Sequence, residues 1–435
     1  MKWCNNYMKI LEGKKIFIYT LGCKVNQYES DAMLEKLLDA GAVKGTENDA
    51  DICIVNTCSV TNMADRKSRQ ILSRMKKQCP DAIVIATGCY VQACSSELLE
   101  NQLCDVIMGN NRKKDVVRII SEFLLERNTS DNIIDINKDS EFEDLKVNMP
   151  ETHTRAYIKI QDGCNSFCSY CIIPFLRGRI RNKPIDEIYD EVVNYAKNGV
   201  KEVVLTGINI SSYGDIGEYD LADVICRIAT VEGIERIRLG SLEPRVITDE
   251  FLNRIKDIPK VCPHFHLSLQ SVCDKTLKNM NRKYTVDDIK RICKALRDTY
   301  KFPALTADII VGFPGETDED FEVTRANLEE LNLYEMHVFK FSRRKGTVAD
   351  GMKDQIPETE KTRRSDILLK MRDENMKNYN DLFKGDTINV LVEEITEKNG
   401  RSYYRGHTER YMDVLIPINE EADTSKINTI IQTEY

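Results

Sequence analysis

The sequence lacks a long apolar segment, and it has no excess of positive charge. No uncharged apolar run approaches the roughly 20 residues that a membrane-spanning helix needs, and residues 1–15 are polar and charged, without a signal-peptide core. These absences favour a cytoplasmic protein with no membrane partner. The formal net charge of −8 argues against a strongly basic nucleic-acid-binding protein. Any contact with RNA must therefore be local.

Cysteine, in contrast, is plentiful, with 15 residues in a chain of 435. An odd number in a large chain without a leader favours reduced thiols and metal ligands over a disulfide framework. The composition is 42% apolar and 30% charged, which is typical of a soluble globular protein. This length is sufficient for two or three domains, each with its own core.

Three cysteines, Cys164, Cys168 and Cys171, lie close together with the spacing C-x3-C-x2-C, and the next cysteine is only Cys226. We call these three the triplet. Ferredoxin-type sequences supply four thiolates to a cluster that only transfers electrons. Three thiolates leave one iron of a four-iron cluster without a protein ligand, and an open iron can bind and activate a small molecule. A structural zinc ion is the alternative, but it would normally need four ligands.

The hydrophobic pattern predicts an α/β protein with three structured parts and a linker. In the first 120 residues strands alternate with helices, which predicts a doubly wound parallel sheet. The strands are predicted at 15–20, 51–56, 82–87 and 105–108, and the helices at 27–40 and 62–78. Residues 128–151 are polar, acidic and weakly patterned, so we interpret them as a linker between a first domain, 1–127, and the rest.

A second alternation of strands and helices predicts a partial (βα)6 barrel within a domain spanning 152–375. Its active site should lie at the carboxyl ends of the strands. The strands are predicted at 156–160, 202–205, 236–239, 265–269, 305–311 and 336–341. A charged helix at 357–382 leads to a C-terminal all-β domain, 376–435, whose strands at 388–394, 402–406 and 412–418 fit a small closed barrel.

Cys23, Cys58 and Cys89 are far apart in sequence, yet each follows a predicted strand of the first domain at nearly the same offset. We call them the second cysteine set. The carboxyl ends of neighbouring parallel strands lie along one edge of a sheet, so three thiolates could converge there on a second metal site. Each cysteine considered alone could instead be a small buried hydrophobic residue, but the common offset favours convergence. Cys94 is the nearest rival ligand.

Several motifs together carry a resemblance to a known family. The spacing of the triplet is that of the radical S-adenosylmethionine (SAM) enzymes, and the first domain resembles the amino-terminal domain of the methylthiotransferases. The segments that carry the resemblance in the first domain are TLGCKVNQYES at 20–30, NTCSVT at 56–61 and TGCY at 87–90. The segments that resemble the radical core are KIQDGC at 159–164, CIIP at 171–174, RG at 177–178, HFHLSLQS at 264–271 and VGFPGET at 311–317. The C-terminal part resembles a TRAM domain, an RNA-binding β-barrel, so the resemblance covers almost the whole chain.

The resemblance implies two 4Fe-4S clusters, one on the triplet and one on the second cysteine set. The first would bind SAM and cleave it to a 5′-deoxyadenosyl radical that abstracts hydrogen from C2 of an adenine. The second would present a sulfur that a second SAM methylates, so that two SAM molecules are used per turnover. The implied partners are tRNA, an electron donor such as flavodoxin or ferredoxin, and a sulfur donor.

The substrate of the subfamily that the chain most resembles is N6-threonylcarbamoyladenosine in tRNA, near the anticodon. Two sets of residues carry this resemblance: 22–27 and the segment His337-Val338-Phe339 with Ser342, Arg344, Gly346 and Thr347. Related subfamilies act on isopentenyladenosine in tRNA or on an aspartate of a ribosomal protein. A non-catalytic iron–sulfur protein that binds RNA and senses redox state is the alternative from another class.

The predicted barrel also indicates which residues contact SAM, because the carboxyl ends of its strands should surround the ligand. These residues are Gly207, Asn209, Ser241, Glu243, Gln270, Val311 and Gly312. Gly207 and Gly312 would admit the backbone close to the ligand, although ordinary loop turns would also explain them. Glu243 could bind a ribose hydroxyl or cap a helix, and the sequence leaves both open.

Candidate RNA contacts lie in two places. Arg177, Arg179 and Arg181 follow the triplet directly, where cations suit phosphate contact near the chemistry. Arg401, Arg405 and Arg410 lie in the C-terminal domain. From residue 376 onward acidic residues outnumber basic ones by 11 to 7. RNA binding by this domain must therefore depend on a local face.

Overall fold

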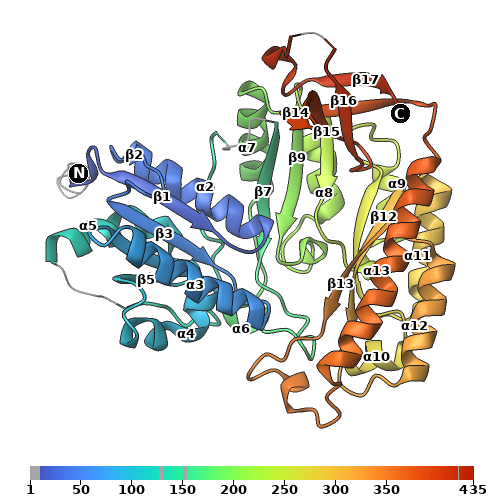
Figure 1. Ribbon diagram of the computed structural model, residues 1–435, viewed down its shortest axis with the longest axis horizontal. Coiled ribbons are helices and arrows are strands. Elements are labelled where there is room, and N and C mark those ends of the chain that lie inside the picture. The colour runs from blue at the N-terminus through green and yellow to red at the C-terminus, as the bar shows by residue number, and fades with distance from the viewer. Residues whose placement is uncertain (1–9, 127–130, 150–153, 420) are drawn as a thin grey trace.

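The computed structural model describes residues 10–126, 131–149, 154–419 and 421–435. Its N-terminal unit is a parallel sheet with helices on both faces (Figure 1). The strand order is β2-β1-β3-β4-β5-β6, with β1 Lys15–Thr20, β2 Val43–Lys44, β3 Ile52–Thr57, β4 Ile83–Gly88, β5 Val106–Met108 and β6 Asp131–Asn132. The helices are α2 Lys24–Asp39, α3 Asn62–Gln78, α4 Cys89–Glu100, the 3-10 turn η1 Lys113–Asp115 and α5 Val116–Glu126.

Every residue of the central strands β3 and β4 is buried, as expected for parallel strands that are covered on both faces. Residues of α2 and α5 pack on one face of the sheet, and residues of α3 and α4 pack on the other. The predicted doubly wound sheet is therefore confirmed. Helix α2 begins at Lys24, three residues before the predicted start, because Cys23 is still extended and the helix follows it at once.

The second unit is a partial barrel of six parallel strands. Strands β7 Arg155–Asp162, β9 Glu202–Gly207 and β10 Arg236–Leu239 form one sheet with the short antiparallel β8 Arg181–Asn182. Strands β11 His264–Gln270, β12 Ala304–Val311 and β13 Glu335–Lys340 form another. Two isolated parallel bridges, Ile237–Val261 and Leu242–Leu267, join the sheets. The predicted order of strands is confirmed, and the barrel is open beyond β13.

Helices and short turns cover the outside of the barrel. They are α6 Ile173–Arg177, α7 Ile185–Lys197, η2 Ile210–Ser212, α8 Leu221–Ala229, η3 Pro244–Val246, α9 Asp249–Ile255, α10 Asp274–Asn279, α11 Val286–Thr299, α12 Asp318–Leu331, η4 Val348–Gly351 and α13 Glu358–Asp381. Apolar residues of these elements, apart from α6 and η4, share one large core with the strands. Leu145 and Val147 also belong to this core, so part of the segment interpreted as a linker packs against the barrel. Residues 127–130 and 150–153, around its two ends, lie outside the described residues.

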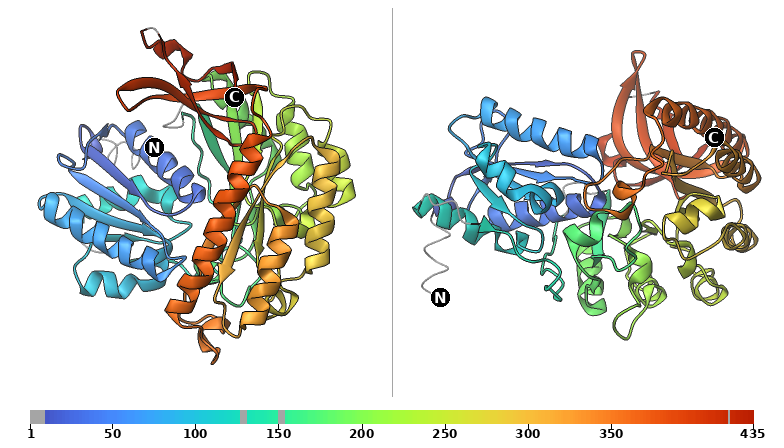
Figure 2. Two further views of the ribbon diagram at one scale, coloured as in Figure 1. Left: turned by 45° about the vertical axis from the view of Figure 1, so that its right-hand side comes forward. Right: turned by 90° about the horizontal axis from the view of Figure 1, so that it is seen from below.

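The C-terminal part is a curled antiparallel sheet in the order β16-β15-β14-β17, consistent with a TRAM-like barrel. Its elements are β14 Thr387–Lys398, β15 Arg401–Thr408, β16 Asp413–Pro417, the turn η5 Thr424–Lys426 and β17 Ile430–Glu434, of which β17 was not predicted. Helix α13 contacts β13 and leads to this sheet (Figure 2).

The C-terminal sheet covers the amino ends of the barrel strands. Arg236, the first residue of β10, donates to the carbonyls of His407 and Asn389 at 2.9 Å. Arg155, the first residue of β7, pairs with Glu393 at 2.8 Å. The C-terminal sheet therefore lies at the end of the barrel opposite to the loop that carries the triplet.

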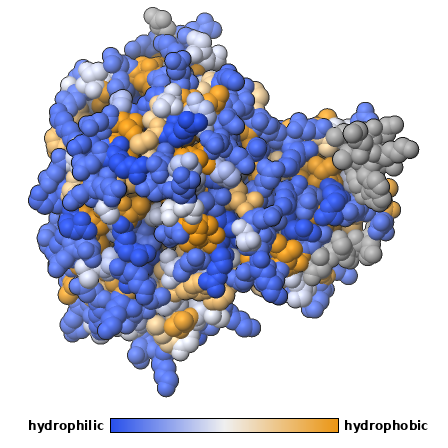
Figure 3. All heavy atoms as spheres, turned by 180° about the vertical axis from the view of Figure 1, so that it is seen from behind, coloured by the Kyte–Doolittle hydropathy of each residue, from blue (hydrophilic) through white to orange (hydrophobic). Residues whose placement is uncertain are grey.

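Figure 3 shows a largely hydrophilic face on which apolar side chains are scattered in small groups. Within the described residues, no helix combines the length and the apolar composition needed to cross a membrane.

Candidate functional site

The triplet lies in the loop after β7, at the carboxyl end of the barrel strands, and its cysteines line a cavity of about 330 Å³. Gly163 permits the sharp turn into this loop. Its φ is +73°, and a Cβ there would lie 1.8 Å from the Arg179 carbonyl oxygen. The Cys164 N–H donates to the Gly178 carbonyl at 3.0 Å. The loop therefore closes on residues 178–179.

The middle of the same loop is held by the segment that follows α10. The Asn281 side chain donates to the Phe167 carbonyl at 3.1 Å. The Arg282 guanidinium donates to the Cys168 sulfur at 3.2 Å. The sulfur positions thus depend on contacts from elsewhere in the barrel as well as on the loop itself.

The second cysteine set lies along one edge of the N-terminal sheet, as the common offset predicts. Cys23 caps α2 after β1, Cys58 follows β3, and Cys89 is the first residue of α4 after β4. Burial, with smaller contributions from the nearby Cys89 and Cys23 thiols, raises the pKa of Cys58 to about 11. The structure thus brings these three residues together, whereas Cys94 lies at a kink within α4 and packs against the cluster beneath α3 and α4.

Two glycines permit this convergence. A Cβ on Gly22 would lie 3.1 Å from the Cys58 sulfur, and Gly22 has a φ of +100°. Gly88 has a φ of +94°, and a Cβ there would lie 2.4 Å from the Thr57 carbonyl oxygen. Only glycine fits this close approach of neighbouring strand ends.

The donor sets fit iron–sulfur clusters better than single metal ions. Burial raises the pKa of the Cys171 thiol to about 12, so its thiolate needs a compensating cation, and coordination to a metal deprotonates a thiol outright. Among the described residues, neither cysteine set has its three sulfurs mutually within 4.8 Å. Ligands of one zinc ion, with Zn–S near 2.3 Å, would lie about 4 Å apart. A cluster spreads its thiolates over different irons.

Four of the seven residues predicted to contact SAM line the cavity beside the triplet. They are Asn209, Ser241, Glu243 and Gln270. Gln270 has a φ of +66° at a register shift at the end of β11, an unfavourable conformation that places it at the cavity. Strained backbone of this kind is common at functional sites.

The other three predicted residues, Gly207, Val311 and Gly312, do not line this cavity. Val311 is fully buried in the core. A Cβ on Gly312 would lie 2.3 Å from Lys361 Cγ, so this glycine admits the side chain of a helix α13 residue and not a ligand. A Cβ on Gly207 would lie 2.8 Å from the Gln161 carbonyl oxygen. These residues shape the strand ends. Because none of them lines the cavity, the structure does not support their predicted contact with SAM.

Glu243 presents its carboxylate to the cavity and does not cap a helix. It precedes η3 without a capping hydrogen bond from its side chain. Its carboxylate accepts from Arg245 at 2.8 Å and from the Asn209 amide at 3.4 Å. Of the two roles that the sequence left open, helix capping is not observed, and the contact with a ribose hydroxyl stays a prediction.

The same cavity also receives residues from the N-terminal unit. Val60 and Thr61, which follow Cys58, line it opposite the barrel. Arg344 fixes this contact, because its guanidinium donates to the Ser59 hydroxyl at 2.9 Å and pairs with Asp65 at 2.7 Å. One cavity therefore borders both the triplet and the loop that carries a member of the second cysteine set.

The six arginines predicted to contact RNA divide into two groups. The side chains of Arg177 and Arg181 are 1% exposed and bonded within the protein, so the prediction that they contact RNA is wrong for this structure. These two residues alternate in sequence with the exposed Arg179, so the sequence gave no sign of their burial. Arg179 is exposed and lies over the Phe167 ring at 4.6 Å.

In the C-terminal sheet Arg401 is exposed at the start of β15. Arg405 is exposed too, but it pairs with Asp413 at 3.0 Å and with Glu394. Arg410 donates to the carbonyls of residues 301 and 302. Arg401 is thus the best placed of the three for contact with RNA.

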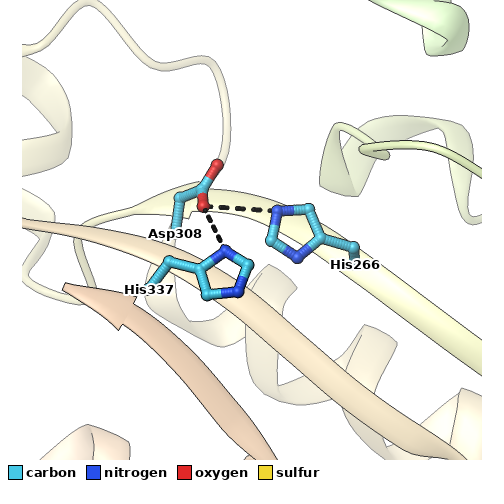
Figure 4. A group of neighbouring side chains, drawn as sticks. All are labelled: His266, Asp308 and His337. Carbon is cyan, nitrogen blue, oxygen red and sulfur yellow. Dashed lines mark hydrogen bonds and ion pairs between the residues drawn. The ribbon is translucent and has the colours of Figure 1, made fainter. Parts of the chain in front are cut away.

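Sequence reasoning missed a group of polar side chains in the barrel. His266, Asp308 and His337 come from the neighbouring strands β11, β12 and β13, with one Asp308 oxygen 3.3 Å from each imidazole (Figure 4). Asp308 lines the cavity. Hydrogen bonds to Asp308 and Glu335 raise the pKa of His337 to about 9, so His337 and Asp308 form an ion pair at neutral pH. Strand alternation was the available signal, because it directs these residues to one face.

Comparisons with known proteins agree with this geometry. The family model described as the radical SAM superfamily matches residues 158–328, and the model described as uncharacterized protein family UPF0004 matches residues 15–109. The chain is 36% identical over 410 residues to the threonylcarbamoyladenosine tRNA methylthiotransferase MtaB of Bacillus subtilis, which covers 93% of this chain and 91% of that protein. It is 34% identical over 440 residues to the tRNA-2-methylthio-N(6)-dimethylallyladenosine synthase of Acetivibrio thermocellus, covering 98% and 90%.

Among solved structures, the chain is similar to the radical SAM methyltransferase TsrM of Kitasatospora setae, determined with cobalamin and a [4Fe-4S] cluster bound. The TM-score is 0.56 with 14% identity, over 75% of each chain. At this identity the likeness concerns the fold alone.

Proposed function

We propose that this chain, which belongs to the radical SAM methylthiotransferase family, adds a methylthio group to C2 of N6-threonylcarbamoyladenosine in tRNA. The observation that carries the proposal is the shared cavity. It is lined by all three cysteines of the triplet and, from the N-terminal unit, by Val60 and Thr61 next to Cys58. Radical formation and sulfur transfer need adjacent sites, because the carbon that loses hydrogen must meet the sulfur.

The proposed roles follow from position. A 4Fe-4S cluster on the triplet would supply the electron that cleaves SAM, and one on the second cysteine set would supply the sulfur, so that two SAM molecules are used per turnover. Glu243 and Asn209 offer a carboxylate and an amide to the hydroxyl and amino groups of bound SAM. Gln270 orients the ligand from the end of β11, and Arg282 neutralises negative charge beside Cys168.

The proposed tRNA contacts are the exposed cations near the cavity. Arg179 follows the triplet, and Arg66 and Lys67 lie in the first turns of α3, just after Thr61. Arg401 would contact the tRNA farther from the reacting base. Lysine and arginine at such places suit phosphate contact. An electron donor of the flavodoxin or ferredoxin class, a sulfur donor and a cytoplasmic location complete the proposal.

The substrate is tested by mass spectrometry of tRNA nucleosides from a strain that lacks this chain and has no redundant enzyme. We expect the 2-methylthio derivative of threonylcarbamoyladenosine to disappear and that of isopentenyladenosine to persist. The opposite pattern would assign the chain to the isopentenyladenosine substrate. Purified, anaerobically reconstituted protein should also form 5′-deoxyadenosine on reduction. A fully loaded protein that forms none would instead be a non-catalytic sensor.

A further inference from the structure

The Arg177 side chain contacts the second cysteine set, although this residue belongs to the barrel unit. It is the last residue of α6, six residues after the triplet, and its side chain is 1% exposed. Its Nε donates to the Cys89 sulfur at 3.4 Å. It therefore lies between the two cysteine sets, bonded to one and close in sequence to the other.

The same guanidinium reaches the loops of the other two cysteines through Asn26. Arg177 donates to the Asn26 side-chain oxygen at 2.7 Å. The Asn26 amide in turn donates to the carbonyls of Leu21 at 2.7 Å and Thr57 at 3.0 Å. These carbonyls lie two residues before Cys23 and one before Cys58. Arg177 and Asn26 together thus connect all three strand-end loops.

Arg177 is also part of a buried network of charges. Both oxygens of the Glu29 carboxylate accept from its guanidinium, and Glu29 pairs with Lys159 at 2.7 Å and Lys113 at 3.0 Å. Asp162, which immediately precedes the loop of the triplet, pairs with Lys159 at 2.6 Å and contacts Arg177 at 3.4 Å. The network therefore extends from the second cysteine set to the base of the triplet loop.

The network carries a surplus of positive charge. Its buried cations are Lys113, Lys159, Arg177 and Arg181, and its buried carboxyl groups are Glu29, Asp162 and Glu143, the last of which interacts electrostatically with Lys113 and Lys159. Four cations against three carboxylates leave one positive charge without a buried carboxylate. An uncompensated buried charge is costly, so an anion is expected beside the network. The cation that contacts a sulfur is Arg177, which locates that anion at Cys89.

We propose that Arg177 is a positioning residue of the second cysteine set, which holds the three loops in register and donates a charge-assisted hydrogen bond to the Cys89 thiolate of a bound cluster. This inference rests on the proposed function, since it requires a cluster at that site. Hydrogen bonds to cluster sulfurs and nearby positive charge favour the more reduced state, so Arg177 raises the reduction potential of the cluster.

The test uses the full chain with the triplet changed to alanine, so that only a cluster on the second cysteine set contributes to the spectra. Arg177→Lys and Arg177→Gln are made in this background. Arg181→Lys is the matched control, because Arg181 is equally buried and bonds Asp162 and the Arg177 carbonyl but contacts no cysteine sulfur. Iron content is measured after anaerobic reconstitution, and the midpoint potential is measured by a redox titration followed by electron paramagnetic resonance.

We expect both Arg177 variants to have a lower midpoint potential than the parent and Arg177→Gln to bind several-fold less iron, while Arg181→Lys titrates like the parent. Arg177→Lys keeps the buried charge and should fold, but a lysine cannot form hydrogen bonds to Cys89, Asn26 and Glu29 at the same time. The midpoint potential of this variant therefore remains informative if Arg177→Gln does not fold. If Arg177→Lys is fully loaded with iron and has the parent's midpoint potential, the inference about Arg177 is wrong, but the proposed function is not affected. A parent that binds no iron would overturn the second cluster of the proposed function as well.

Discussion

The two cysteine sets differ in how the chain assembles them. The triplet occupies one loop, closed by Gly163 and held by residues around Asn281, and its sulfurs face an open cavity. The second cysteine set is assembled from three strand ends and is held by a buried network in which Glu29 is central. The first site is therefore a local structure, whereas the second depends on the packing of the two units against each other.

Because the two cysteine sets are assembled differently, substitutions at them should have different consequences. Altering the triplet should affect chemistry in one loop and leave the fold intact. Altering the network around the second cysteine set should affect both the metal site and the stability of the protein, because its partners come from β7, α2, η1 and α6.

The largest effect is expected from single cysteine substitutions, which should separate the two reactions. Cys168→Ala should abolish both 5′-deoxyadenosine formation and methylthio transfer, because without its cluster SAM is not cleaved. Cys58→Ala should abolish methylthio transfer and retain SAM cleavage. Chromatography of nucleosides from one anaerobic assay measures both products. Loss of SAM cleavage in Cys58→Ala with the triplet fully loaded would remove the distinction between the sites.

A large loss of stability is expected for Glu29→Gln. Removal of this carboxylate leaves Lys113, Lys159 and Arg177 short of a buried partner, at a cost of about 3–5 kcal/mol. Urea denaturation of the metal-free protein measures this loss in the free energy of unfolding. Glu235→Gln is the control, because its pair with Lys201 lies at the surface and contributes less than about 1 kcal/mol. Equal unfolding midpoints for the two variants would contradict the role of the network.

The same network has an expected pH dependence. Its cations hold the pKa of Glu29 well below the usual range. The stabilisation is therefore present above the unfolded pKa of about 4.3 and is lost as the pH falls through the folded value. The difference in stability between the wild type and Glu29→Gln should shrink under acid conditions.

A smaller and site-selective effect is expected from two glycine substitutions. Gly163→Ala should reduce iron at the triplet, and Gly88→Ala should reduce iron at the second cysteine set, because each Cβ meets a backbone oxygen. Left-handed backbone alone costs about 1–2 kcal/mol, and the clash adds to it. Gly346→Ala is the control, with a φ of +87° and open space around it. Iron analysis of each variant in the matching triple-alanine background distinguishes the sites, and equal loss at both would show that the sites are not independent.

The smallest effect concerns His337, which belongs to neither set. Its pKa of about 9 lies above the ordinary value of about 6.5. The ion pair with Asp308 therefore stabilises the protein fully below about pH 6.5, and this is lost as the pH rises through about 9. The side chain is 49% exposed, so the contribution should be below about 1 kcal/mol. Thermal unfolding of His337→Gln should differ from the wild type at pH 6 and agree with it at pH 10, and a constant difference would contradict the ion pair.

The comparison also explains what the sequence could predict. The triplet was predictable because its spacing is local, and the second cysteine set because parallel strands place their carboxyl ends at one edge. Glu29, Lys113 and Lys159 carry no pattern that pairs them, since their contact depends on how two units pack. Arg177 was misread for the same reason, because the burial of this charged residue depends on contacts with the N-terminal unit and leaves no local trace in the sequence. The His337 ion pair required the register of β12 and β13, which the sequence does not give.

If the chain binds two separate iron–sulfur clusters, iron and sulfide analysis of three proteins will distinguish them. These are the wild type, the protein with the triplet changed to alanine, and the protein with the second cysteine set changed to alanine, each reconstituted anaerobically. We expect about eight irons for the wild type and about four for each variant. A wild type with four irons, or loss of all iron in either folded variant, would contradict this expectation.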